Sequence, residues 1–255
     1  MNPQALRGIR IVLVGTTHPG NIGATARAMK NMGLTRLFLV RPKVFPHAEA
    51  SARASGADDV LAAATVCHTL DEAIHNCTLV VGTSARPRSI AWPNLGIRET
   101  ARHCIDQGSH GDAALVFGRE KAGLSNEELD RCHFLTRIPC NPEFSSLNLA
   151  ASVQLLSYEL RMAAGGDGGA PPECTDPDDP LATSAELEHF YAHLQSTLIG
   201  LGFLDPHNPR HLMRRLRRLY HRVRLTHREL NILRGMLTAC GRHLDAGRHP
   251  PPPSP

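Results

Sequence analysis

The sequence predicts an α/β domain built on a parallel sheet, followed by a small all-helical domain. Short runs rich in Val, Ile and Leu alternate with helix-like segments through residue 163. These runs lack the polar–apolar alternation of a half-wetted strand, which favours a parallel sheet covered on both faces. After residue 183 only helical periodicity remains, so the second domain should contain no sheet.

The first repeat of this pattern lies within the first 40 residues. Residues 9–14 form an apolar run that ends at Gly15, and we expect a buried strand there. A loop rich in Gly, Pro and Asn leads into a helix that should stop at Gly33, and residues 36–40 form the next strand. Strand, loop, helix and strand in this order are typical of a parallel sheet.

The alternation continues through the rest of the domain. Helices are expected at 48–64 with a break at Ser55-Gly56, at 70–76, at 97–107 and at 126–131 after a Ser125 cap, and strands at 78–82, 113–118 and 134–138.

The stretch 138–161 combines an irregular loop with an apolar helix. Pro139 and Pro142 favour extended backbone before them and remove two backbone donors, so the loop cannot continue as a helix or a central strand. Ser145 or Ser146 is the expected N-cap of the helix that follows. Because a helix start leaves N–H groups unpaired, we expect this loop and helix start to hold a cofactor.

Four regions follow from these patterns. Residues 1–163 form the α/β domain, and residues 164–183, rich in Gly, Pro and Asp, form a flexible acidic linker. Residues 184–248 form a basic helical domain with helices at 184–200, 209–223 and 226–244, the last with capping-box spacing from Thr226 to Glu229. Residues 249–255, HPPPPSP, should be a disordered tail.

Positive charge is concentrated in the helical domain. Residues 206–228 contain eight arginines and no acidic residue, within a chain of net charge +4. A basic block on a folded helix indicates a polyanionic partner such as nucleic acid, although a solvated helix face would have the same composition. We expect RNA contacts from Arg214, Arg217 and Arg218.

The sequence also indicates in which compartment the protein works and whether it binds a metal. The seven cysteines occur singly with no CxxC pair, which suits a reducing cytoplasm rather than a disulfide framework. No apolar run is long enough to cross a bilayer, and the first residues, MNPQALRGIR, lack the long apolar stretch expected of a signal peptide. Three histidine pairs have spacings that metals use, but no cysteine or carboxylate completes a set, so we expect no metal.

Three motifs concentrate small, polar and charged residues at loop-to-helix or strand-to-loop junctions. The first is NIGATAR at 21–27, the second is FGREKAGLS at 117–125, and the third is the stretch 138–161. GTSAR at 82–86 supports them as a further strand end. Ligands bind beyond the carboxyl ends of strands in open α/β sheets, so the strand-end motifs point to one edge.

Together these motifs resemble the SPOUT class of S-adenosylmethionine-dependent RNA methyltransferases, over residues 9–163. Four segments look specifically like those of bacterial enzymes that methylate the 2′-hydroxyl of tRNA nucleotide 32, a cytidine or uridine in the anticodon loop. These segments are GTSAR, FGRE, NPEFSSLNLA and the late LNILRG. The resemblance implies a trefoil knot and a homodimer. It also implies cofactor contacts from Thr83, Ser84, Ala85, Gly118, Arg119, Glu120, Ile138, Ser145, Ser146, Leu147 and Asn148. We further expect RNA contacts from Asn21 and from Arg86, a basic residue near this site.

By the same resemblance, Arg27 and Ser146 occupy the catalytic positions. A guanidinium with a pKa above about 12 is a poor base at neutral pH, so we expect Arg27 to orient the ribose and stabilise the developing oxyanion. Gly15, where many relatives have an acid, and Pro19 depart from the pattern. Two alternatives stay open: a 2′-O-methyltransferase of ribosomal RNA or another tRNA nucleotide, and a non-catalytic RNA-binding protein.

Overall fold

The computed structural model describes residues 5–84, 92–107, 111–165 and 178–248, with side chains up to residue 243. The chain divides into two compact units, Met1–Cys174 and Thr175–Pro255. The predicted site residues Ala85 and Arg86, most of the predicted linker and the predicted disordered tail lie outside the described residues.

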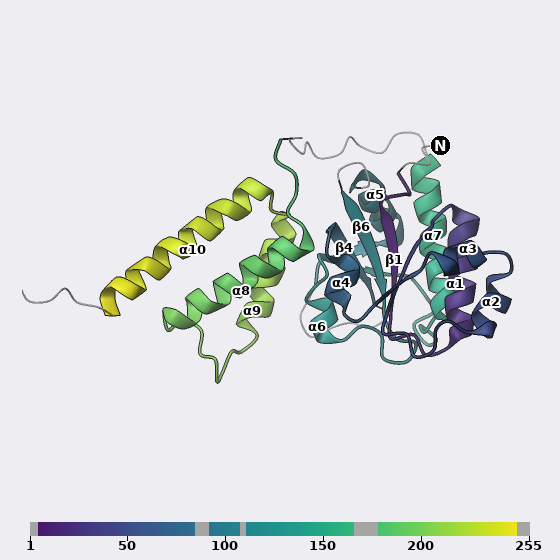
Figure 1. Cartoon of the computed structure of the whole chain (residues 1–255), viewed down its shortest axis with the longest axis horizontal. Coiled ribbons are helices and arrows are strands. Elements are labelled where there is room, and N and C mark those ends of the chain that lie inside the picture. The colour runs from purple at the N-terminus through teal and green to yellow at the C-terminus, as the bar shows by residue number, and fades with distance from the viewer. Residues whose placement is uncertain (1–4, 85–91, 108–110, 166–177, 249–255) are drawn as a thin grey trace, which may run out of the picture. The chain divides into compact units, whose positions relative to one another are not determined.

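The first unit is built on a seven-stranded parallel sheet in the order β3-β2-β1-β6-β4-β7-β5 (Figure 1). Its strands are β1 (Ile9–Val14), β2 (Arg36–Val40), β3 (Thr65–Cys67), β4 (Cys77–Thr83), β5 (Asn94–Gly96), β6 (Asp112–Phe117) and β7 (Phe134–Arg137). The prediction of a parallel sheet is confirmed. The two strands at its edges, β3 and β5, were not predicted, because three residues carry too little periodicity to identify a strand.

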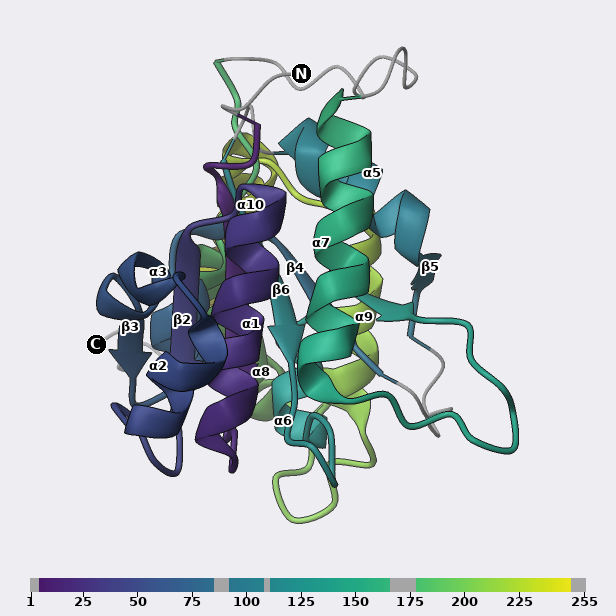
Figure 2. The same cartoon turned by 90° about the vertical axis from the view of Figure 1, so that its right-hand side faces the viewer.

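Helices cover both faces of this sheet, as the uninterrupted apolar runs predicted. Their bounds are α1 (Pro19–Met32), α2 (Ala48–Ala54), α3 (Asp58–Ala62), α4 (Leu70–Ile74), α5 (Ile97–Gln107), α6 (Asn126–Leu129) and α7 (Leu149–Gly165). One core cluster joins α1, α2, α3, α5 and α7 to the sheet, and a second joins α4 and α6 to the opposite face. Figure 2 shows α1 and α7 lying side by side.

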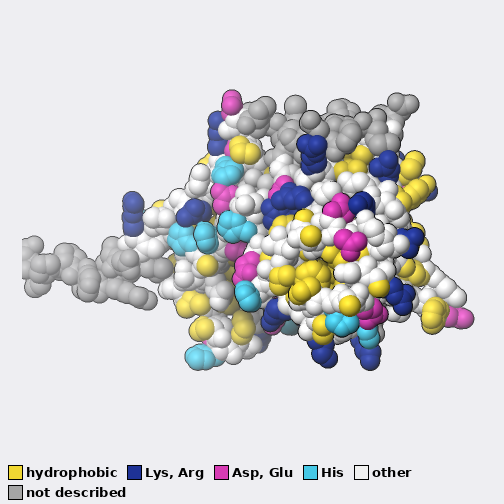
Figure 3. All heavy atoms as spheres, turned by 45° about the vertical axis from the view of Figure 1, so that its right-hand side comes forward, with side chains coloured by type: hydrophobic (Ala, Val, Ile, Leu, Met, Phe, Trp, Pro, Cys, Tyr) yellow, Lys and Arg dark blue, Asp and Glu magenta, His cyan; other side chains and the backbone are white. Residues whose placement is uncertain are grey.

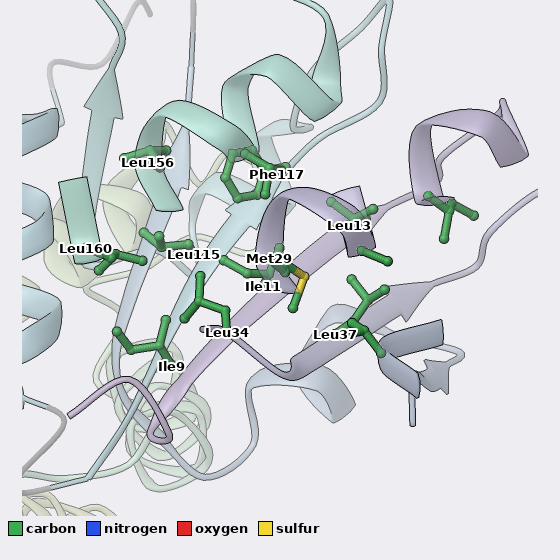
Figure 4. Packing of buried hydrophobic residues seen from close by; sticks show 14 of the residues in the cluster. Ile9, Ile11, Leu13, Met29, Leu34, Leu37, Leu115, Phe117, Leu156 and Leu160 are labelled. Atoms are coloured by element: carbon green, nitrogen blue, oxygen red, sulfur yellow. The ribbon is translucent and has the colours of Figure 1, made fainter. Parts of the chain in front are cut away.

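Alternation of side chains along each strand divides these two cores. Ile9, Ile11 and Leu13 of β1 point into the larger cluster, whereas Val12 and Val14 belong to the smaller one. Figure 4 shows the β1 residues of the larger cluster packed with Met29 of α1, Leu115 and Phe117 of β6, and Leu156 and Leu160 of α7. Side chains on both faces of the sheet are apolar, so polar and apolar residues do not alternate along these strands in the sequence.

A buried ion-pair group fixes the amino ends of the central strands. Arg10 is 6% exposed and donates to the carboxylate of Asp112 and to the Ala73 carbonyl, the latter at 2.8 Å. Arg36 donates to the same carboxylate at 2.7 Å. Burial opposes ionisation, but the two guanidinium groups outweigh it and hold the pKa of Asp112 below its ordinary value. The group thus ties β1, β2 and β6 together.

The second unit contains three helices, α8 (Ser184–Gly200), α9 (Leu212–Val223) and α10 (His227–Arg248). Thr183 and Glu186 form a capping box at the start of α8. The predicted box between Thr226 and Glu229 is confirmed by two reciprocal hydrogen bonds of 3.3 and 2.9 Å. Phe190 and Tyr191 of α8 are buried in the core of this unit.

None of the described helices is both long and apolar enough to cross a membrane.

Candidate active site

A cavity of about 200 Å³ opens where β4, β6 and β7 end. Its walls come from the carboxyl ends of these three strands and from the loop that leads into α7. They are lined by Thr83, Ser84, Phe117, Gly118, Arg119, Glu120, Lys121, Ala122, Gly123, Thr136, Ile138, Cys140, Ser145, Ser146, Leu147, Leu149 and Ser152. The strand-end motifs therefore meet at one edge of the sheet, as their positions in the sequence predicted.

Backbone geometry shapes the loop after β6. Arg119 and Gly123 form an antiparallel bridge with hydrogen bonds of 3.2 and 2.8 Å, which folds the loop back on itself. A Cβ atom at Gly118 would lie 2.1 Å from the Gly123 carbonyl carbon, so only glycine permits this turn. The turn presents residues 119–123 to the cavity.

Arg119 anchors this loop to α6. Its guanidinium donates two hydrogen bonds of 2.9 Å to the carboxylate of Glu128, which also completes a capping box with Ser125. Partial burial opposes ionisation of Glu128, but the Arg119 guanidinium and the Ser125 N–H outweigh it and lower its pKa below the ordinary value. The same ion pair raises the pKa of Arg119.

Gly15, one of the two departures from the family pattern, makes room for this arginine. It has φ +60°, and a Cβ atom there would lie 2.9 Å from the Arg119 Nε. A larger residue at this position would displace the Arg119 side chain from its path to Glu128.

Glu120 connects the same loop to the start of α1. Its carboxylate accepts hydrogen bonds from the Thr17 N–H and hydroxyl, the His18 N–H and the Asn21 amide, at 3.0 to 3.3 Å. Burial raises the pKa of Glu120, but these donors, led by Asn21, lower it overall. The ionised carboxylate therefore organises the turn before α1.

Asn148 connects α1 to the start of α7. Its side-chain oxygen accepts from the N–H groups of Ala150 and Ala151 at 2.9 and 3.3 Å, and its amide donates to Asn21 at 3.1 Å. The prediction of Ser145 or Ser146 as the N-cap was wrong. The irregular loop extends two or three residues further than expected because Asn148 supplies a strong capping oxygen next to Asn21.

Most, but not all, of the described site residues predicted for the first unit line the cavity. The cavity is lined by Thr83, Ser84, Gly118, Arg119, Glu120, Ile138, Ser145, Ser146 and Leu147. Asn21 and Asn148 lie outside the lining but join it through Glu120. Arg27 is exposed on α1 and does not line the cavity of its own chain.

Several lining residues had not been identified from the sequence. Thr136 is 1% exposed within β7, and its position beside two predicted strand ends was the available signal. Lys121 and Gly123 were part of the quoted FGREKAGLS motif, but the sequence did not show which residues of that loop face inward. Cys140 lies between the two prolines of the last loop.

The basic helix α9 presents its arginines unequally. Arg217 is ion-paired with Glu188, with one contact at 2.8 Å, and lies 4.3 Å from the centre of the Tyr191 ring. Arg214 and Arg218 are partly buried, whereas Arg215 and Arg222 are exposed. Arg215 and Arg222 belong to the predicted basic block of residues 206–228 but were not among the three RNA contacts named from the sequence.

Within the described part of the chain, no group of three or more His, Cys, Asp or Glu side chains could hold a metal ion.

Two family models match the chain. The SpoU rRNA Methylase family matches residues 8–158, and the C-terminal domain of the tRNA methyltransferase TrmJ matches residues 185–249. The first match alone covers more than half of the chain and contains every described residue that lines the cavity.

Relatives match over almost the full length. The chain is 57% identical to the tRNA (cytidine/uridine/adenosine-2′-O-)-methyltransferase TrmJ of Pseudomonas aeruginosa, covering 90% of this chain and 92% of the relative. It is 51% identical to the tRNA (cytidine/uridine-2′-O-)-methyltransferase TrmJ of Klebsiella pneumoniae, covering 92% of this chain and 96% of that one. The crystal structure of TrmJ from Z. mobilis ZM4 superposes with a TM-score of 0.79 at 35% identity, covering 91% and 98% of the two chains. The chain therefore belongs to the SpoU methylase family, in its TrmJ branch.

Proposed function

We propose that this protein transfers a methyl group from S-adenosylmethionine to the ribose 2′-hydroxyl of tRNA nucleotide 32, a cytidine or uridine in the anticodon loop. The observation that carries the proposal is the convergence of the ends of β4, β6 and β7 on one cavity. The tRNA 2′-O-methyltransferase relatives support the choice of reaction and substrate. A tRNA substrate also favours a cytoplasmic location.

The cavity lining fits the proposed cofactor. Hydroxyl groups of Thr83, Ser84 and Ser146 can hydrogen-bond a ribose or an amino-acid group, and Ile138 and Leu147 offer apolar surface to a purine. The narrow turn at Gly118 lets backbone groups approach a ligand closely. When bound, S-adenosylmethionine supplies a sulfonium methyl group for transfer. We include in the proposal a trefoil knot that contains the loop before α7.

Arg27 has the chemistry to orient the substrate. Its exposed guanidinium carries five donors and a permanent positive charge, which suit a phosphate or a ribose oxygen with developing negative charge. Methyl transfer demands alignment of the hydroxyl oxygen with the methyl carbon, and a cation that binds this oxygen or the adjacent phosphate would serve the alignment. Ser146, in the cavity wall, can position either the cofactor or the ribose.

A homodimer would complete the site. Leu155, Tyr158 and Met162 of α7 are 39%, 49% and 51% exposed and follow at helical spacing, so they form one apolar stripe opposite the buried face of this helix. Figure 3 shows patches of apolar side chains reaching the surface between charged ones. Burial of this stripe against a second copy would let Arg27 of one chain serve the cavity of the other.

Ribose-methylation mapping of tRNA incubated with the pure protein and S-adenosylmethionine tests this function. We expect a 2′-O-methyl group at nucleotide 32, and for Arg27→Ala a loss of turnover with cofactor affinity within about twofold of wild type. A methyl group on ribosomal RNA or at another tRNA nucleotide would replace the proposed substrate. RNA binding without any methyl transfer would overturn the enzymatic proposal.

A further inference from the structure

We propose that the Phe144 ring stacks on the base of the nucleotide whose ribose is methylated, and so holds that nucleotide over the cavity. This inference rests on the proposed function and names a substrate contact for the same site. Phe144 is 80% exposed, more than any other large apolar side chain of the described residues. Its neighbours Ser145 and Ser146 line the cavity.

The loop holds this ring away from the protein interior. The Glu143 N–H donates to the Asn141 side chain at 3.0 Å, and the Phe144 N–H donates to the Asn141 carbonyl at 3.0 Å. Figure 2 shows the loop between β7 and α7 extending outward from the body of the first unit. Two hydrogen bonds and Pro142 thus fix a turn whose last residue presents an aromatic side chain to solvent.

The surroundings of Phe144 suit a nucleotide. Lys121 is exposed and lines the same cavity as Ser145 and Ser146, the residues that follow Phe144. An aromatic face for a base and a cation for a phosphate are the usual means by which proteins hold unstacked nucleotides of RNA loops. Nucleotides of an RNA loop can be splayed out of the stack, and a base of the anticodon loop displaced in this way is exposed for Phe144 to receive.

A double-mutant cycle between the ring and the base tests the contact directly. We would measure kcat/KM of the full-length protein for tRNA that carries either the normal base or an abasic ribose, with its 2′-hydroxyl intact, at the methylated position. The enzymes compared are the wild type, Phe144→Ala, Phe144→Tyr and, as a control, Val66→Ala, which alters an exposed apolar residue of β3.

Loss of one stacked base corresponds to a decrease of about 5- to 150-fold. We expect that decrease for Phe144→Ala on normal tRNA and for wild type on abasic tRNA, but no further decrease when both changes are combined. Phe144→Tyr and Val66→Ala should resemble wild type. Cofactor affinity, measured by calorimetry, and the sedimentation coefficient should not change in Phe144→Ala.

Three results would overturn the inference: independent decreases from the ring and the base, weaker cofactor binding in Phe144→Ala, or dissociation of that variant into monomers. The second would make Phe144 a structural part of the loop, and the third would make it a contact to a second copy. Absence of methyl transfer by the wild-type protein would instead reject the proposed function itself.

Discussion

The Glu128 carboxylate makes two kinds of contact. It accepts hydrogen bonds from the Arg119 guanidinium and from the Ser125 N–H, which belongs to the capping box of α6. Its side chain is 10% exposed, so few water molecules could replace the guanidinium if the pair were broken. The cavity loop therefore depends on a residue that does not line the cavity itself.

Replacement of Glu128 by Gln should lower the free energy of unfolding by about 1.5–3 kcal/mol at neutral pH, because charged hydrogen bonds are lost and Arg119 is left half-buried. The folded-state pKa of Glu128 lies below its ordinary value of 4.5, so the wild-type advantage is complete above that pH. It should disappear as the pH falls through the folded-state pKa.

Urea unfolding at several pH values measures this difference. Trp92 is the single tryptophan, is buried, and donates to the Cys132 carbonyl at 2.9 Å, so its fluorescence follows the first unit alone. Glu127→Gln, at the exposed neighbouring position, is the matched control and should change little. An equal, pH-independent loss in both variants would contradict the assigned role.

Residue roles were only partly accessible from the sequence. The motif residues Gly118, Arg119 and Glu120 were predicted at the cavity and do line it. The contacts that hold them were not predicted: Arg119 pairs with Glu128, and Glu120 accepts from Asn21, which lies 99 positions away in the chain. Local periodicity contains no information on such contacts.

At the scale of elements, Asn148, the residue just before α7, caps the helix and also contacts Asn21 beside the site. Asn148→Asp retains the capping oxygen but removes the donor to Asn21, whereas Asn148→Ala removes both. We expect Asn148→Ala to lose about 1 kcal/mol of stability and Asn148→Asp to lose little. Both should lower kcat/KM by about 3- to 10-fold, since the link from α7 to α1 is broken in each.

Trp92 fluorescence during unfolding and tRNA methylation kinetics provide the two measurements for Asn148. A normal kcat/KM for Asn148→Asp would show that the bond to Asn21 has no part in the reaction. Ser146→Ala is not a suitable control here, because Ser146 lines the cavity. Ser51→Ala on the exposed side of α2 is suitable.

Helix α9 separates arginines with structural contacts from exposed ones. Charge reversal of Arg215 and Arg222 together should weaken tRNA binding and reduce the slope of log affinity against log salt by about one to two, since each phosphate contact contributes about 0.7–0.9. Arg217→Ala should instead lower the thermal stability of the second unit, because its pair with Glu188 and its contact with Tyr191 are lost.

Filter binding over a range of salt concentrations measures the slope, with Arg53→Glu on α2 as an exposed control. An unchanged slope in the Arg215 and Arg222 double variant would assign this face of α9 to a different contact.

At the scale of the whole molecule, the apolar stripe of α7 predicts self-association. Tyr158→Glu places a charge within this stripe, so we expect monomers in sedimentation velocity experiments and a loss of tRNA methylation. Val66→Glu alters an equally exposed apolar residue on β3 and should leave the mass unchanged. A Tyr158→Glu variant that remains dimeric would place the interface elsewhere.

The architecture was largely predictable, because the uninterrupted apolar strands and regular helix signals act locally. The order of the strands in the sheet was not predictable. In the sheet β6 lies between β1 and β4, although it follows β4 in the chain after about 30 residues. Pairing of that kind depends on which surfaces fit together, and short apolar strands are nearly interchangeable in the sequence. The α/β class was predicted from periodicity, whereas membership of the SPOUT class was expected only from the resemblance of the motifs.

The ion-pair group of Arg10, Asp112 and Arg36 has a consequence for engineering. It lies where β1, β2 and β6 begin, whereas the cavity opens where β4, β6 and β7 end. The ion-pair group and the cavity therefore lie at opposite edges of one sheet. Stabilising substitutions near this ion-pair group should therefore affect turnover less than substitutions beside the cavity, so the fold could adapt to a higher temperature without a change in its active site.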